Sequence, residues 1–108
     1  MKDEVKIKLL KEAVSQKRQC EEERKAVNET ILAKRKEMEE QILEGGTINV
    51  AKEKYLEILD NEILRKNNNA KIKRLTGAIE KIITGEGDYD DEQLTLEDFM
   101  AINEDSEE

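Results

Sequence analysis

No proline interrupts this chain of 108 residues, and its first glycine is Gly45. Proline breaks helices because its ring clashes with the preceding turn and it lacks an N–H donor, and glycine weakens them through its conformational freedom. Residues 4–44 contain neither and consist largely of Lys, Glu, Arg, Ala and Leu, which lose little rotamer freedom in a helix. We therefore expect one long helix over residues 4–44.

The dipeptide Gly45-Gly46 ends this helix, because glycine adopts the left-handed conformation of a helix C-terminus without steric cost. Thr47 follows as an N-cap, since its hydroxyl oxygen can accept a hydrogen bond from a first-turn N–H. A second helix is expected over residues 48–84, before the glycines at positions 85 and 87.

Apolar residues recur along both helices at intervals of three, four and seven, which is the spacing of a coiled-coil seam. Each helix has apolar ends and a polar middle, and the two middles (15–25 and 65–69) face each other if the chain folds back at residues 45–46. The expected fold is all-α, a long antiparallel, coiled-coil-like helical hairpin over residues 1–84. The expected seam comprises Ile7, Leu10, Val14, Val27, Ile31, Met38 and Ile42 in the first helix, and Ala51, Tyr55, Ile58, Leu59, Ile63, Ile72, Leu75, Ile79, Ile82 and Ile83 in the second.

Composition limits how much core this hairpin can build. Only 36% of the residues are hydrophobic and 3% are aromatic, whereas 43% are charged. Two helices with a narrow seam bury little surface. We therefore expect the hairpin to form a homodimer with four helices or to dock on another protein.

The last 24 residues differ from the rest of the chain in charge. Residues 85–108 contain 11 acids and no Lys or Arg, whereas residues 1–84 hold all 19 bases against 16 acids. We expect 85–108 to be an acidic, partly disordered tail, with its extreme end, 104–108, disordered. A short helix capped by Thr95 is expected within it, with Leu96, Phe99 and Met100 on its apolar side.

This tail contains Gln93-Leu94-Thr95-Leu96-Glu97-Asp98-Phe99-Met100. The segment resembles the PIP box, the peptide with which proteins dock on DNA sliding clamps such as the PCNA ring. That pattern has a Gln, an aliphatic residue three positions later, and aromatics six and seven positions later. Gln93, Leu96 and Phe99 match it, and Met100 stands where the second aromatic is usual. The resemblance covers 8 of the 108 residues and implies that Gln93, Leu96, Phe99 and Met100 bind a partner.

Two interpretations of the same residues stay open at this point. In the first, Leu96, Phe99 and Met100 form an apolar plug for a pocket on a clamp. In the second, they fold back on the hairpin together with Ile102 as a short third helix, because the hairpin is short of core and has no other Phe.

A basic segment lies in the second helix, with five bases and no acid between positions 65 and 74. Without interleaved aromatic residues it is poorly suited to stacking on single-stranded bases, and the net charge of −8 repels DNA. We expect pairing with Glu21, Glu22 and Glu23 or with the acidic tail, and no direct nucleic-acid binding. The basic residues are Arg65, Lys66, Lys71, Lys73 and Arg74.

The residues required for catalysis are scarce. The chain has no His, and Cys20 therefore has no imidazole to activate it. The acids between 88 and 92 alternate as in a calcium loop, but Gln93 and Phe99 occupy the positions of its essential Gly and Glu. We expect neither enzymatic activity nor a cofactor or metal site.

A lone cysteine fits a reducing compartment, the first residues lack the apolar core of a signal peptide, and no apolar run is long enough to span a bilayer. We therefore expect a cytoplasmic protein that does not contact membranes. The tail motif predicts an accessory factor of DNA replication that binds a polymerase or sliding clamp. Two alternatives remain, a small assembly scaffold or chaperone of viral type that packs on a shell protein, and an acidic inhibitor of a nucleic-acid-binding protein.

Overall fold

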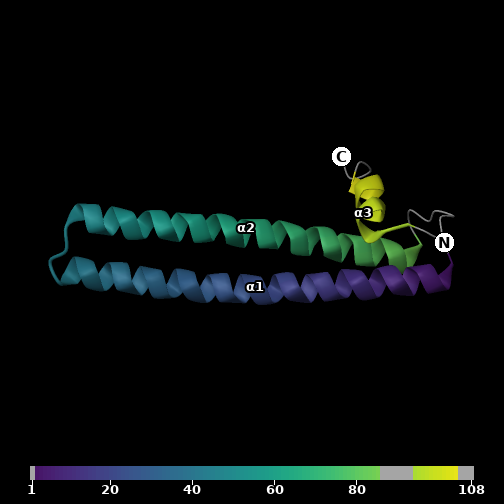
Figure 1. Ribbon diagram of the computed structural model, residues 1–108, viewed down its shortest axis with the longest axis horizontal. Coiled ribbons are helices and arrows are strands. Elements are labelled where there is room, and N and C mark those ends of the chain that lie inside the picture. The colour runs from purple at the N-terminus through teal and green to yellow at the C-terminus, as the bar shows by residue number, and fades with distance from the viewer. Residues whose placement is uncertain (1, 86–93, 105–108) are drawn as a thin grey trace. The chain divides into compact units, whose positions relative to one another are not determined.

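The computed structural model describes residues 2–85 and 94–104, and their side chains up to Ile102. It contains α1 (Asp3–Leu43), α2 (Ile48–Thr84) and α3 (Leu96–Glu104), as Figure 1 shows. The two long helices pack antiparallel, which confirms the all-α, coiled-coil-like hairpin, and their bounds agree with the predicted ones to within one residue.

The turn between α1 and α2 depends on its two glycines. Gly45 has a φ of 86°, and the Gly45 and Gly46 amides donate to the carbonyls of Ile42 (3.2 Å) and Gln41 (2.8 Å). This pair of bonds is the Schellman arrangement, which satisfies carbonyls left open at a helix end. A Cβ on Gly46 would lie 2.7 Å from the Gln41 carbonyl oxygen, so a larger residue does not fit there. The Val50 amide donates to Thr47 Oγ1 at 3.4 Å, which confirms the predicted N-cap.

The chain forms two compact units. Unit 1 combines Met1–Cys20 with Ala70–Glu108, and unit 2 is Glu21–Asn69. Helices α1 and α2 each contribute one part to unit 1 and the other to unit 2, and α3 belongs to unit 1.

Unit 1 has a continuous hydrophobic core to which all three helices contribute. The α1 register differs from the predicted one, because Leu9 and Ala13 are buried whereas Ile7 and Val14 are exposed. On α2, Ile83 was also predicted in the seam and is exposed. The buried core residues are Leu9, Ala13, Cys20, Leu75, Ala78, Ile82, Leu94, Leu96 and Phe99.

Unit 2 buries far fewer apolar side chains. Ile31 and Ile58 are its buried hydrophobic residues, and Asn68 is buried with them. Ile42, Tyr55 and Ile63, which the apolar spacing placed in the seam, are exposed. The prediction was wrong there because polar residues occupy the positions of α2 that face α1: after Ile58, the intervals of three and four lead to Asn61, Arg65 and Asn68.

Within unit 2 the two predicted polar middles meet at one end only, because Arg24 and Asn69 belong to them whereas Asn28 lies outside 15–25. Arg24 Nη1 donates to Asn69 Oδ1 at 3.0 Å, and Arg65 Nη1 donates to Asn28 Oδ1 at 3.5 Å. These bonds pair ascending positions of α1 with descending positions of α2. They therefore specify the antiparallel register where apolar contacts are sparse.

The burial pattern predicts opposite outcomes for two neighbouring residues of α1. Ile31→Ala should lower the free energy of unfolding by about 2–4 kcal/mol, because it leaves a cavity between α1 and α2. Leu32→Ala, the matched control, should cost well under about 1 kcal/mol, because the Leu32 side chain is 67% exposed. Urea unfolding followed by circular dichroism measures both. Equal losses would contradict the register of α1 in unit 2.

Candidate functional site

Within the tail motif, Leu94 and Thr95 precede α3, and the residues from Leu96 to Met100 form its first part. Thr95 caps the helix: the Asp98 amide donates to Thr95 Oγ1 at 3.1 Å, and the Phe99 amide donates to the Thr95 carbonyl at 3.0 Å. This confirms the short helix and its predicted cap. The cap fixes where α3 begins. Leu96 and Phe99 are three positions apart and therefore lie on the same side of the helix.

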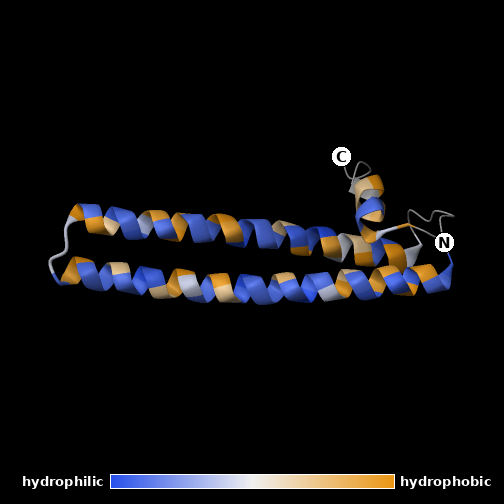
Figure 2. Cartoon of the chain, in the orientation of Figure 1, coloured by the Kyte–Doolittle hydropathy of each residue, from blue (hydrophilic) through white to orange (hydrophobic). Residues whose placement is uncertain are grey.

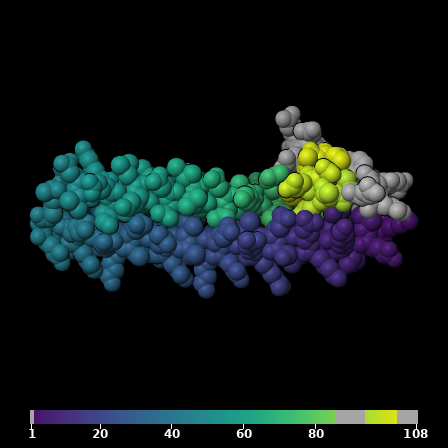
Figure 3. Space-filling view, viewed as in Figure 1, coloured from purple at the N-terminus to yellow at the C-terminus, as the bar shows by residue number. Residues whose placement is uncertain are grey.

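That side faces the core of unit 1. Leu96 and Phe99 are both 0% exposed, Leu94 is also buried, and Met100 packs against the same cluster from a half-buried position. In the space-filling view of Figure 3, α3 lies over part of α2 and borders α1 within unit 1. Phe99 is among the largest fully buried side chains in the described part of the chain.

Two alanines explain why unit 1 accepts so large a side chain. Ala13 of α1 and Ala78 of α2 are buried members of the cluster that contains Phe99. Small side chains on paired helices leave space that a third element has to fill if the interior is to be close-packed. Leu9 and Ile82 extend the apolar surface of this cluster. The sequence signal that could have located the docking site is this replacement of large seam residues by alanine.

Among the residues predicted to bind a partner, Leu96, Phe99 and Met100 therefore lie together at one site, and Gln93 lies outside the described residues. The arrangement matches the fold-back interpretation for these three residues, whereas Ile102, which that interpretation also included, is exposed. Their binding to a partner stays a prediction, and it now requires α3 to leave unit 1.

The predicted basic segment is divided between the units. Lys66 is exposed in unit 2, whereas Lys71, Lys73 and Arg74 are exposed in unit 1. Arg65 is half-buried in unit 2, where its guanidinium donates to the amide oxygen of Asn28. Arg65 thus forms part of the contact between α1 and α2.

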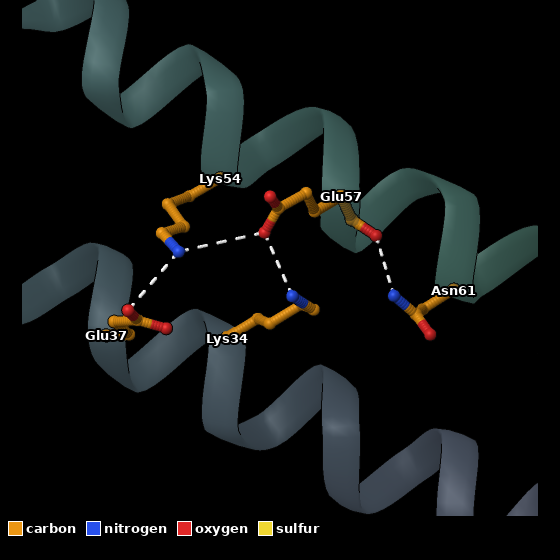
Figure 4. Close-up of polar contacts among 5 residues, drawn as sticks. All are labelled: Lys34, Glu37, Lys54, Glu57 and Asn61. Atoms are coloured by element: carbon orange, nitrogen blue, oxygen red, sulfur yellow. Dashed lines mark hydrogen bonds and ion pairs between the residues drawn. The ribbon is translucent and has the colours of Figure 1, made fainter.

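Unit 2 also contains a group of ion pairs that cross from α1 to α2 (Figure 4). Lys34 Nζ lies 2.9 Å from Glu57 Oε2 and Lys54 Nζ lies 3.2 Å from Glu37 Oε1, both across the two helices. A weaker pair within α2 joins Lys54 Nζ to Glu57 Oε2 at 3.8 Å. The hydrogen bond from Lys34, followed by the charges of Lys34 and Lys54, lowers the pKa of Glu57 from 4.5. The hydrogen bond with Glu37 is the main cause that raises the pKa of Lys54 above 10.5. A further pair joins Arg35 Nη2 and Glu62 Oε1 at 2.6 Å.

The second notable feature of unit 2 is its exposed hydrophobic side chains, which do not take part in the contact between α1 and α2. Figure 2 shows hydrophobic residues recurring along α2 among hydrophilic ones. Eight large hydrophobic side chains of unit 2 are exposed, compared with the two that are buried. Where such side chains lie next to one another, an exposed apolar patch marks a protein-interaction site. The exposed eight are Leu32, Ile42, Leu43, Ile48, Tyr55, Leu56, Ile63 and Leu64.

Within residues 2–85 and 94–104, no three Cys, Asp or Glu side chains gather in a way that could hold a metal ion. None of the described helices combines the length and apolar character that crossing a membrane requires. Cys20 is buried with its thiol free, consistent with its predicted role as a small apolar seam residue.

Comparison with protein-family models, with curated proteins and with solved structures finds no match to this chain.

The ion pairs predict a pH dependence. Because its pKa is lowered in the folded state, Glu57 stabilises the protein at neutral pH, and this contribution is lost as the pH falls through the folded pKa, below 4.5. Lys54 acts in the opposite range: its contribution is complete below 10.5 and is lost as the pH rises through its raised pKa. Glu57→Gln should therefore lower the free energy of unfolding at pH 7 and change it little near about pH 3.

Urea unfolding of the wild type and of Glu57→Gln at the two pH values measures this difference. Glu53→Gln, at an exposed position of the same helix, is the control and should have a small effect at both. A loss for Glu57→Gln that is as large in acid as at neutrality would show that the carboxylate charge is not what stabilises unit 2.

Proposed function

We propose that this protein is a non-enzymatic helical interaction protein that works by binding other proteins. The observation that carries the proposal is the distribution of side chains in unit 2, where charged and amide side chains join the helices beside Ile31 and Ile58 while eight large apolar side chains are exposed. Such an arrangement adds little to the stability of the unit itself, and it leaves a surface that gains free energy when a partner covers it.

Within this class, we propose an accessory role in DNA replication, with α3 and its flanks as the segment that reaches a sliding clamp or polymerase. The support is the match of Gln93, Leu96 and Phe99 to the clamp-docking pattern. The burial of Leu96 and Phe99 sets a condition, because a partner must replace the core of unit 1 as the environment of these side chains.

Exchange between two apolar environments is physically reasonable for a helix of this size. Helix α3 has nine residues, below the length at which isolated helices persist in water, so it holds its shape by being docked. A clamp pocket would supply an equivalent docking site. The apparent affinity of the full chain would be the affinity of the released segment multiplied by the fraction of molecules in which α3 is released.

This mechanism predicts that a peptide spanning residues 88–108 binds a purified ring-shaped sliding clamp more tightly than the full chain does. In the peptide, Phe99→Ala should weaken binding by at least about 1 kcal/mol, the usual threshold for an anchor residue. Glu97→Ala, at an exposed position of α3, is the matched control and should have little effect. Isothermal titration calorimetry measures all of these affinities.

In the full chain, Leu94→Ala should raise the affinity for the clamp toward that of the peptide. Leu94 is part of the unit 1 core, so its truncation favours the release of α3, and it occupies a variable position of the motif. If neither the peptide nor the Leu94→Ala chain binds the clamp, the replication role fails and α3 is a structural part of unit 1. Capture of a shell protein by the intact chain through unit 2 would instead support the scaffold or chaperone alternative.

A further inference from the structure

Helix α2 carries a second apolar face in unit 2, separate from the one that contacts α1. It consists of Ile48, Tyr55, Leu56, Leu59 and Ile63, here called the outer stripe. Four of these side chains are more than half exposed, at 72% for Ile48, 53% for Tyr55, 59% for Leu56 and 57% for Ile63, and Leu59 is half-buried. At 3.6 residues per turn the five positions fall within roughly 100° of the helix circumference.

The spacing of the outer stripe is symmetric about the point between Tyr55 and Leu56. Ile48 and Ile63 are equally far from that point, one before it and one after it, and so are Lys52 and Leu59. A twofold axis through this point would therefore place the stripe of one chain on the same stripe of a second, antiparallel copy. Ile48 would meet Ile63, and Tyr55 would meet Leu56, as a self-complementary interface requires.

The charged residues beside the stripe fit the same arrangement. Lys52, the polar position within the stripe, would lie over Leu59 of the second copy and beside Asp60, the next residue along. Its methylene groups can cover the leucine while the ammonium group meets the carboxylate. A parallel pairing in register would instead place Lys52 against Lys52, where the like charges repel.

We propose that the outer stripe is a self-association surface, through which two copies of the chain pair antiparallel along α2 of unit 2. This inference rests on the proposed interaction role of unit 2 and names its partner. Four exposed side chains per copy make a small interface, so we expect dimerisation in the micromolar range or weaker, with rapid exchange.

Sedimentation-equilibrium measurements on the full chain over a range of concentrations test the proposal. Ile63→Ala should weaken dimerisation at least tenfold. Leu64→Ala is the matched control, because Leu64 is a neighbouring aliphatic residue, 51% exposed, that lies roughly 130° around the helix from the centre of the stripe. It should leave the dimerisation constant unchanged. Far-ultraviolet circular dichroism of each variant verifies that the helices are intact.

Charge exchange tests the antiparallel geometry. Lys52→Glu and Asp60→Lys should each weaken the dimer severalfold, and the double variant should restore it, because the two residues meet only between copies paired antiparallel about the twofold axis. Weakening by both single changes without restoration would overturn the antiparallel pairing. Equal effects of Ile63→Ala and Leu64→Ala would overturn the stripe as the interface.

A chain that stays monomeric at all concentrations would overturn self-association. If such a monomeric chain bound a different protein through the outer stripe, the proposed interaction role of unit 2 would still be supported. If Ile63→Ala changed neither self-association nor the binding of any protein that the intact chain captures, both the inference and the role of unit 2 would fail.

Discussion

Unit 1 depends on the burial of Phe99 beside a seam that contains two alanines. Ala13 and Ala78 contribute small side chains to the cluster between α1 and α2, and Phe99 and Leu96 of α3 supply large ones to the same cluster. Interiors pack at the density of organic crystals, so the space beside small side chains has to be filled by protein or by a partner. The side chains that resemble a docking plug are therefore, in this arrangement, the missing part of a core.

Unit 2 meets the same shortage of apolar residues in a different way. Its helices are joined around Ile31 and Ile58 and by charged and amide contacts such as Lys34–Glu57 and Arg24–Asn69. Exposed ion pairs contribute little net free energy, yet their geometry selects one register among several that sparse apolar contacts would allow. The apolar residues that do not take part in this contact stay outside, where they can stabilise the unit only by contacting another molecule.

The sequence was sufficient to predict the elements that depend on local chemistry. The absence of proline, the Gly45-Gly46 pair and the caps at Thr47 and Thr95 specified the three helices closely. The facing residues of unit 2 were harder to predict, because the apolar periodicity of α2 has two solutions and the structure uses the more polar one. The position of α3 was left open because one apolar trio, Leu96, Phe99 and Met100, fits either its own core or a foreign pocket.

The single Phe of the chain gives direct access to the central claim, that Phe99 is part of the unit 1 core. Incorporation of 4-fluorophenylalanine labels only this position, and the fluorine resonance can be compared in H₂O and D₂O. A core residue should show almost no solvent-isotope shift in the folded chain and a full shift in urea. Leu9→Ala, which removes a member of the same cluster, should make the folded resonance more sensitive to solvent. A folded-state isotope shift equal to that in urea would show that Phe99 is in water, and would contradict the account.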